Sequence, residues 1–284
     1  MPIEPGVLVL VLLAAVLHAT WNALVKAGGD RLIMITLVMA APVPVCIAGL
    51  LLLPPLALAA WPFVLASAAI HYLYYALLVH SYRLGDLSQV YPIARGSAPA
   101  LVAAAAWIFA GEPLRASEMA GVVIVSAGIM SLSWRRRAGL REGEAWAIGL
   151  ALLNGLTIAA YLLVDGMGVR RSGHPLSYIA WLFVLEAAPL IILTLWRRRG
   201  DLVAAFRPHW RTGLGGGLIA GISYGIAIWA MGQGPMAHVV ALRETSVIFG
   251  AAIGTLILKE PFGRRRIIAA TVVATGAVLL NLGL

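Results

Sequence analysis

Two arginines lie inside segments that are otherwise apolar enough to cross a membrane. Arg95 stands in the stretch Val90–Pro99, and Arg243 stands in the stretch Val239–Ser246. A charged side chain at the centre of a membrane helix costs roughly 2.5–3.5 kcal/mol on insertion scales, so such residues usually mark a substrate or ion pathway. A guanidinium can form two parallel hydrogen bonds with a carboxylate or phosphate. The two arginines therefore predict a site for anionic or zwitterionic groups, with an internal ion pair as the structural alternative.

The two arginine stretches are copies of each other. A shift of 148 residues places Arg95 on Arg243 and Gly111-Glu112-Pro113 on Lys259-Glu260-Pro261. Such a repeat fixes the architecture of a chain. We expect residues 1–138 to form a first five-helix repeat and residues 139–284 a second.

The composition predicts that both repeats lie in a membrane. The chain is 61% hydrophobic and 12% charged, with a mean hydropathy of +0.92, whereas soluble domains are about half apolar and a quarter charged. A spanning helix needs about 20 apolar residues. Ten such spans can be placed, at residues 6–25, 32–53, 61–82, 88–110, 115–134, 145–165, 176–196, 212–232, 237–258 and 264–283.

Five spans per repeat is an odd number, so two tandem copies must lie upside down relative to each other. The predicted fold is therefore an all-α integral membrane protein of ten transmembrane helices in two inverted five-helix repeats. Secondary transporters share this plan, and they bind substrate near the midplane between the repeats.

The distribution of positive charge predicts an orientation. The net charge of +9 comes mainly from loops after odd-numbered spans, such as Arg135–Arg137 and Arg197–Arg199, whereas the other loops hold only Arg115, Arg170 and Arg171. Basic loops face the cytoplasm. We therefore expect a multi-pass protein of a bacterial-type cell (inner) membrane with both termini outside, and no nucleic-acid partner.

Further polar and aromatic residues fall on single faces of the predicted helices, at spacings of three and four. Such faces should point into the bundle, although hydrogen bonds between helices, worth about 0.6 kcal/mol each, are the plainer explanation for any one of them. The predicted substrate-binding residues are Arg95, Arg243, Trp21, Asn22, His71, Tyr75, Tyr91 and Tyr161.

Three titratable residues are candidates for proton coupling: His18, Glu186 and Glu244. Histidine titrates near neutrality, and a carboxylate in apolar surroundings can load and release a proton. Glu186 is equally consistent with a structural role as a partner of Arg243. We expect Glu244 to restrain its neighbour Arg243, and Arg95, beside two prolines, to be freer for substrate.

Several motifs of enzymes are missing from the sequence. It has no phosphate-binding Gly-x-x-x-x-Gly-Lys-Ser/Thr loop, no His-Glu-x-x-His and no Gly-x-Ser-x-Gly. Cys46 is the single cysteine. We expect no enzymatic activity, no cofactor and no metal site.

Three stretches resemble one known family. They are Leu17–Lys26 with His18, Trp21 and Asn22, Tyr91–Ser97 with Gly111-Glu112, and Leu242–Ser246 with Lys259-Glu260. The chain is similar over nearly its whole length to EamA-type members of the drug/metabolite transporter superfamily, which implies transport of amino acids, other metabolites or drugs. In the related small multidrug resistance proteins a glutamate precedes the lysine by eight residues. Here His18 holds that position before Lys26.

The sequence thus predicts a secondary active transporter, an exporter of small metabolites such as amino acids or other zwitterionic or anionic solutes, by alternating access. Efflux of cationic or aromatic drugs is one alternative, motivated by the tyrosine and tryptophan faces. A non-transporting membrane subunit that binds a partner is another. Because both repeats are present in one chain, a monomer is possible, as is a homodimer.

Overall fold

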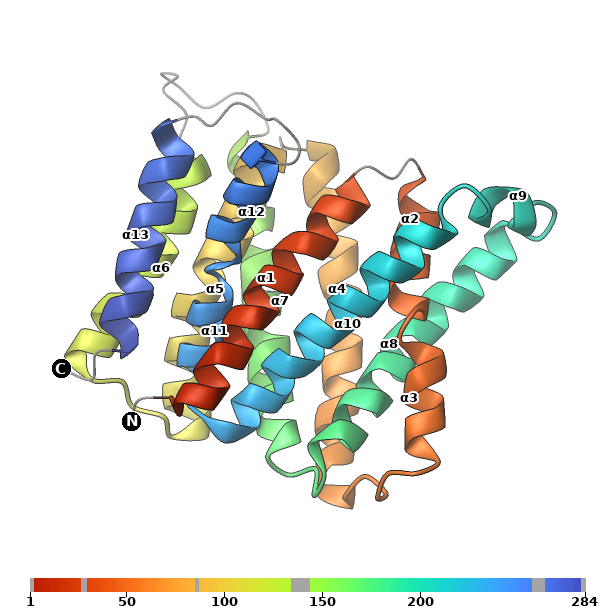
Figure 1. Cartoon of the computed structure of the whole chain (residues 1–284), viewed down its shortest axis with the longest axis horizontal. Helices are drawn as coiled ribbons and strands as arrows, with labels where there is room; N and C mark the ends of the chain where they lie inside the picture. The colour runs from red at the N-terminus through yellow and green to blue at the C-terminus, as the bar shows by residue number, and fades with distance from the viewer. Residues whose placement is uncertain (1–2, 27–29, 85–86, 134–143, 257–263, 282–284) are drawn as a thin grey trace.

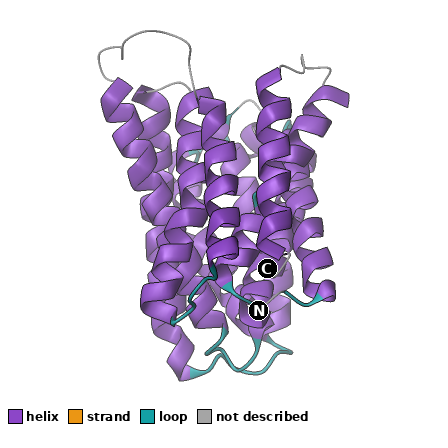
Figure 2. Cartoon of the chain, turned by 90° about the vertical axis from the view of Figure 1, so that its left-hand side faces the viewer, coloured by secondary structure: helices purple, strands orange, loops and turns teal. Residues whose placement is uncertain are grey.

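The computed structural model describes residues 3–26, 30–84, 87–133, 144–256 and 264–281. Every regular element in these ranges is a helix, and the long helices run side by side (Figures 1 and 2). In chain order the elements are α1 (Pro5–Lys26), α2 (Arg31–Ala40), α3 (Val43–Leu50), η1 (Leu58–Ala60), α4 (Trp61–Leu84), α5 (Leu87–Ala110), α6 (Ala116–Met130), η2 (Ser131–Ser133), α7 (Glu144–Val169), α8 (Pro175–Arg197), α9 (Leu202–Phe206), α10 (Trp210–Gln233), α11 (Met236–Arg243), α12 (Ser246–Leu256) and α13 (Arg264–Asn281).

Nine spans in the described residues are long and apolar enough to cross a membrane, and they correspond to the first nine predicted ones. The tenth segment, within α13, has a shorter apolar helix at Ile267–Asn281. The prediction of an all-helical membrane protein is confirmed, and the tenth span stays a prediction. The predicted repeat boundary near residue 138 lies outside the described residues.

Two spans predicted as continuous helices are broken. The first break separates α2 from α3 at Pro42, which lacks a backbone donor and interrupts the helical hydrogen bonds. The second separates α11 from α12 between Arg243 and Ser246, where the chain tightens: Thr245 N donates to Leu242 O three residues back, at 3.0 Å. The second break lies directly after one of the two arginines.

Glycines allow some helices to approach closely. A side chain on Gly121 of α6 would meet the backbone of Gly276 of α13 at 2.8 Å, and the reverse is equally true. Gly217 of α10 lies against the backbone of Val38 in α2 in the same way, because a Cβ added at Gly217 would lie only 2.5 Å from Val38 O. The glycines of α10 and α6 therefore serve as packing faces, as small residues do between membrane helices.

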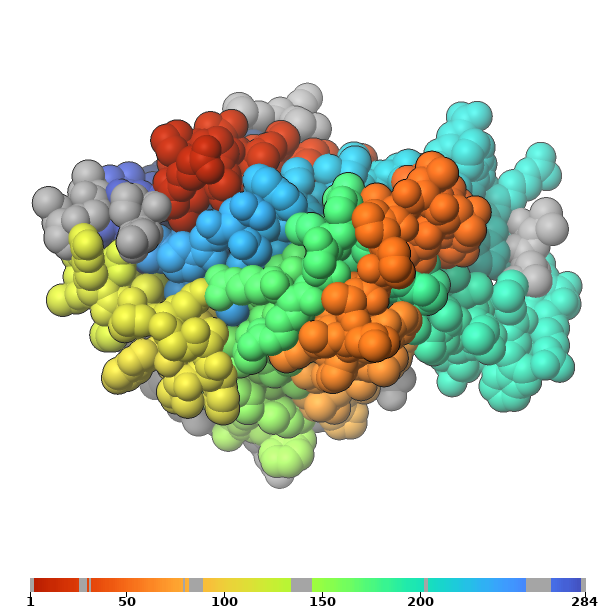
Figure 3. All heavy atoms as spheres, turned by 90° about the horizontal axis from the view of Figure 1, so that it is seen from below, coloured from red at the N-terminus to blue at the C-terminus, as the bar shows by residue number. Residues whose placement is uncertain are grey.

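The two ends of the bundle differ. At the end where α1 begins and α13 ends, called here the termini end, the loops and helix ends meet across the centre (Figures 1 and 3). The opposite end, called the basic end, carries exposed Arg197 at the end of α8, exposed Arg199 just after it, and exposed Arg211 at the start of α10. The charge asymmetry predicted from the sequence therefore separates the two ends in space.

Candidate functional site: a charged central cavity

A cavity of about 210 Å³ lies between the long helices. It starts at the centre of the bundle and extends toward the basic end, where Val25 near the end of α1 and Leu78 near the end of α4 line it. On the termini side of the cavity the side chains of Leu182, Ile228 and Met231 are fully buried. The lining of the cavity therefore lies nearer the basic end than the termini end.

A cluster of ionic and hydrogen-bond contacts joins three helix ends at the termini end. Glu112, before α6, lies 2.5 Å from Arg170 at the end of α7, and it also accepts a hydrogen bond from Met236 N at 2.9 Å. Arg170 in turn donates to the carbonyl oxygens of Met231 and Gly234. Glu112 therefore pairs at the end of a span, whereas its counterpart in the repeat, Glu260, lies outside the described residues.

Arg95 lines the cavity, and its charge is neutralised by a glutamate. Its Nη2 lies 2.5 Å from Glu244 Oε1, and both side chains are buried. The expectation that Glu244 restrains its neighbour Arg243 was therefore wrong, as was the expectation that Arg95 is the freer arginine. Adjacent residues on a helix point in different directions, so Glu244 reaches across to α5 instead.

Arg243 also lines the cavity, and its contacts are with uncharged groups. Its guanidinium carbon lies 5.0 Å from the centre of the Tyr224 ring, and its Nη2 lies 3.3 Å from His18 Nδ1. His18 Nδ1 also accepts from Trp21 Nε1 at 3.3 Å. Both donors lack lone pairs, so Nδ1 of His18 acts as an acceptor and carries no hydrogen. Arg243 Nε is buried without a hydrogen-bond partner in the described part of the chain.

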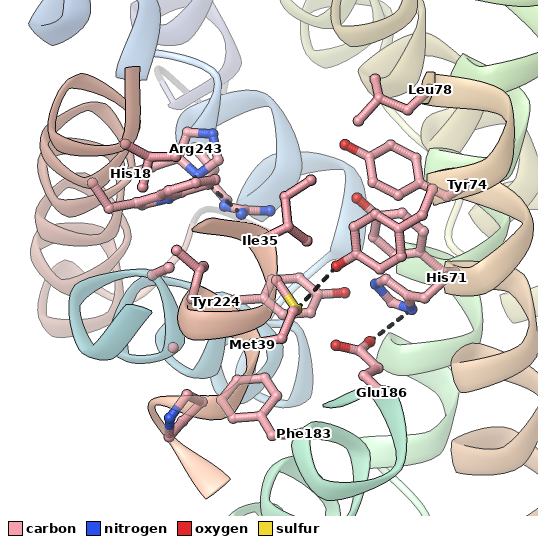
Figure 4. Close-up of a pocket in the computed structure, with 18 of the residues that line it drawn as sticks. His18, Ile35, Met39, His71, Tyr74, Leu78, Phe183, Glu186, Tyr224 and Arg243 are labelled. Atoms are coloured by element: carbon pink, nitrogen blue, oxygen red, sulfur yellow. Dashed lines mark hydrogen bonds and ion pairs between the residues drawn. The ribbon is translucent and has the colours of Figure 1, made fainter. Parts of the chain in front are cut away.

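His71 and Glu186 form the opposite wall. His71 Nδ1 lies 2.8 Å from Glu186 Oε1 and 2.9 Å from Ser67 O. The contact with Glu186 is close but not aligned as a hydrogen bond. Glu186 therefore pairs with His71, and the alternative of a Glu186–Arg243 pair was wrong. Figure 4 shows His18 and Arg243 on one side of the cavity and His71 and Glu186 on the other.

Aromatic rings join the two walls. The Tyr161 ring stacks on His71 with centroids 3.9 Å apart, and it meets Tyr224 edge-on at 6.2 Å. Tyr74 and Tyr75, also in the lining, contact each other at 5.1 Å. The cavity thus combines a cationic side, an acidic side and an aromatic surface between them.

A model of the EamA-like transporter family matches residues 145–282. The chain carries an EamA-like transporter domain. The match confirms the resemblance predicted from the sequence for residues 145–282, and together with the nine apolar spans it supports a multi-pass membrane protein. The EamA-like domain includes α7, α8, α10 and α11, which supply Tyr161, Glu186, Tyr224 and Arg243 to the cavity.

Solved structures share the fold. Among the 27 solved chains that match, one titled "Crystal structure of protein" is 17% identical, with a TM-score of 0.75 and 98% of each chain covered. At this identity the likeness concerns the fold alone. No curated protein matches the chain.

The structure brings together most of the residues predicted for the site. Arg95, Arg243, Trp21, His71, Tyr75, Tyr161, His18 and Glu186 line the cavity. Three others lie outside its lining. Glu244 is buried behind Arg95, Asn22 donates to His18 O of its own helix at 2.7 Å, and Tyr91 lies one turn before Arg95.

Two residues of the EamA-like domain were not predicted for the site. Tyr224 contacts both Arg243 and Asp165, and its signal in the sequence is a tyrosine placed between Gly221 and Gly225 of an otherwise small-residue face. Asp165 is fully buried beneath the cavity. It was recognisable as an acidic residue at the end of an apolar run, but sequence alone suggested no partner for it.

Proposed function

We propose that this chain is a secondary active transporter that exports small zwitterionic or anionic metabolites, such as amino acids, through the central cavity. The observation that carries the proposal is the pair of opposite walls. Arg243 offers a buried donor with no carboxylate at ion-pair distance in the described residues, and Glu186 lies across the cavity. A solute carboxylate would bind Arg243, because a guanidinium matches its geometry. A solute ammonium would face Glu186.

The architecture we propose is ten spans in two inverted repeats, residues 1–138 and 139–284, that move by alternating access. The contacts between helices support it. Packing of α1 on α10 is matched by packing of α7 on α4, and packing of α1 on α12 is matched by packing of α7 on α5. In each comparison, every helix of the first contact is replaced in the second by its counterpart from the other repeat. The break after Arg243 also fits this plan, because discontinuous helices form the binding sites of such transporters.

The lining of the cavity extends toward the basic end, to Val25 and Leu78. With basic loops in the cytoplasm, this conformation would be open to the cytoplasm and ready to accept a solute for export, with both termini outside. The central cavity supports transport rather than a purely structural role as a partner subunit.

Efflux of cationic or aromatic compounds is the second candidate, because four tyrosines line the cavity together with Glu186. Three small compounds distinguish the candidates: phenylalanine, phenethylamine without the carboxylate, and 3-phenylpropionate without the amine. A ligand that binds the folded state raises its stability, so thermal unfolding of the purified protein reports binding. We expect phenylalanine to stabilise most. Equal or greater stabilisation by phenethylamine would favour the cation-efflux candidate instead.

Transport is then tested by counterflow of labelled phenylalanine in liposomes. We expect Arg243→Gln to abolish counterflow and Arg171→Gln to preserve it. Arg171 is a suitable control because it lies outside the cavity lining, where it is exposed and stacks on Phe63. Undiminished counterflow and affinity in Arg243→Gln would refute the proposed site.

A further inference from the structure

Asp165 of α7 is held beneath the cavity by two tyrosines from two other helices. Tyr178 OH of α8 donates to Asp165 Oδ1 at 3.0 Å, and Tyr224 OH of α10 donates to Oδ2 at 2.5 Å. Asp165 and Tyr178 are fully buried, and neither lines the cavity. Asp165 follows Tyr161 by one turn on α7, in the direction of the termini end. It therefore belongs to the closed side of the pathway.

The ionic surroundings of Asp165 differ from those of the other buried carboxylates. Four carboxylates are buried in the described residues. Glu244 lies beside Arg95, Glu186 beside His71 and Glu118 beside His238 at 3.5 Å. Asp165 has no basic side chain at ion-pair distance in the same part of the chain; its closest hydrogen bonds come from the neutral phenols of Tyr178 and Tyr224, and Ser67 of α4 is a further neutral donor. A buried carboxylate without an ionic partner tends to take up a proton instead of staying charged.

The charged and titratable groups on the surrounding helices do not supply that partner. His71 of α4 is engaged by Glu186 of α8, and Arg95 of α5 by Glu244. On α11, His238 is beside Glu118 and Arg243 is at the Tyr224 ring. Tyr178 and Glu186 face Asp165 from α8, Tyr224 faces it from α10, and His71 and Ser67 act on it from α4.

Tyr224 connects Asp165 to the solute site. Its hydroxyl binds the carboxylate, while the guanidinium of Arg243 lies over its ring at 5.0 Å. A proton on Asp165 removes the charge that its two phenol donors stabilise, and so weakens the contacts that join α7 to α8 and α10. Solute at Arg243 and a proton at Asp165 therefore act on the same side chain from opposite sides.

We propose that Asp165 is the proton-binding site that couples this transporter to a proton gradient, with Tyr224 as the link to Arg243. This inference rests on the transport function proposed above. The proton comes from water at the termini end when α7, α8 and α10 separate there, and it leaves to water in the cavity after that end has closed. It binds one carboxylate oxygen, and no other covalent bond forms or breaks.

Proton binding can be measured without a transported solute. The probe is the proton itself, followed by infrared difference spectra of the purified protein between acidic and neutral pH, in the region of the protonated carboxyl C=O stretch. We expect a titrating band that Asp165→Asn removes. The matched control Glu118→Gln, which removes another buried carboxylate outside the cavity, should retain it. A band unchanged in Asp165→Asn would overturn the proposal.

A conformational measurement separates coupling from mere protonation. A single cysteine is placed at Ile228, one turn beyond Tyr224 toward the termini end, in a Cys46→Ser background. We expect acidification to increase thiol labelling several-fold in this single-cysteine protein when Asp165 is present. In Asp165→Asn, which resembles the protonated carboxyl, labelling should be high and independent of pH. If that variant does not fold, Tyr178→Phe combined with Tyr224→Phe should likewise raise labelling at neutral pH.

Labelling that follows pH equally with and without Asp165 would overturn the coupling role. Neither measurement uses a solute, so a negative phenylalanine screen would refute the proposed substrate and leave the proton site standing. Conversely, an unaltered infrared band would refute the proton site and leave the transport proposal standing.

Discussion

Arg95 and Arg243 occupy equivalent positions in two copies of one motif, yet their surroundings are opposite. Arg95 is paired with a carboxylate and lies in α5, which is continuous from Leu87 to Ala110. Arg243 has a histidine and a tyrosine ring as neighbours, and its helix ends at the same residue. The two copies have thus diverged into a structural arginine and an arginine available to a ligand.

Prolines did not decide which of the two arginine-bearing spans breaks. Pro92 and Pro99 lie inside α5 without interrupting it, whereas the break after Arg243 contains no proline. Neighbouring helices can satisfy the backbone groups that a proline frees in a membrane helix. The difference between the two arginines therefore depends on tertiary contacts, and the following variants test it in order of expected effect.

The largest effect should come from removing the partner of Arg95. Glu244→Gln leaves a buried guanidinium without a counter-charge, and such losses typically cost about 3–5 kcal/mol. We expect the free energy of unfolding in detergent to fall by about this amount. Replacing both residues, Arg95→Leu with Glu244→Leu, should recover most of it. A single variant as stable as the parent protein would show that Arg95 is not held by this pair.

Arg243→Gln should give the opposite pattern, with a large loss of ligand binding and a smaller change in stability. A hydrogen bond to a charged group contributes about 1.5–3 kcal/mol, which corresponds to a roughly 10- to 100-fold weaker affinity for phenylalanine. Isothermal titration with the purified protein measures this. If Arg95→Gln and Arg243→Gln weakened binding equally, the two arginines would share the ligand and the contrast drawn here would be incorrect.

The ring of Tyr224 should stabilise the guanidinium of Arg243. A cation–π contact is worth about 0.5–2 kcal/mol. We expect Tyr224→Leu to lower stability by this amount more than Tyr224→Phe, which keeps the ring. Repeating both substitutions with Arg243→Gln completes a double-mutant cycle and isolates the contact. A coupling energy near zero would mean that the ring does not hold the guanidinium.

The smallest effect should come from His18, whose hydrogen bond with the Arg243 guanidinium is long at 3.3 Å and therefore worth about 1.5 kcal/mol, the low end for bonds to charged groups. His18→Leu removes the acceptor for Arg243 and should weaken phenylalanine binding by a corresponding factor. His18→Asn provides an oxygen close to the position of Nδ1 and should retain binding. Equal losses in the two variants would show that His18 acts through its shape instead of through its acceptor.

Much of the fold follows directly from composition and periodicity. Runs of about 20 apolar residues can only be satisfied as helices in a bilayer, which is why nine predicted spans agree with the structure. Both intramembrane arginines and the polar face with His71 and Tyr75 also belong to the cavity as predicted. An ionisable residue in an apolar run can be recognised from sequence because its transfer into a membrane is costly, whatever the direction of its side chain.

The ion-pair and hydrogen-bond partners of the buried charges could not be predicted from sequence. Glu244 is next to Arg243 in sequence but pairs with Arg95, 149 residues away. Asp165 draws its two donors from α8 and α10. The sequence by itself determined that this chain crosses a membrane with buried charges, because hydrophobicity and insertion cost are local properties. Only the tertiary structure decided which charges neutralise each other, because that depends on the packing and rotation of helices distant in the chain.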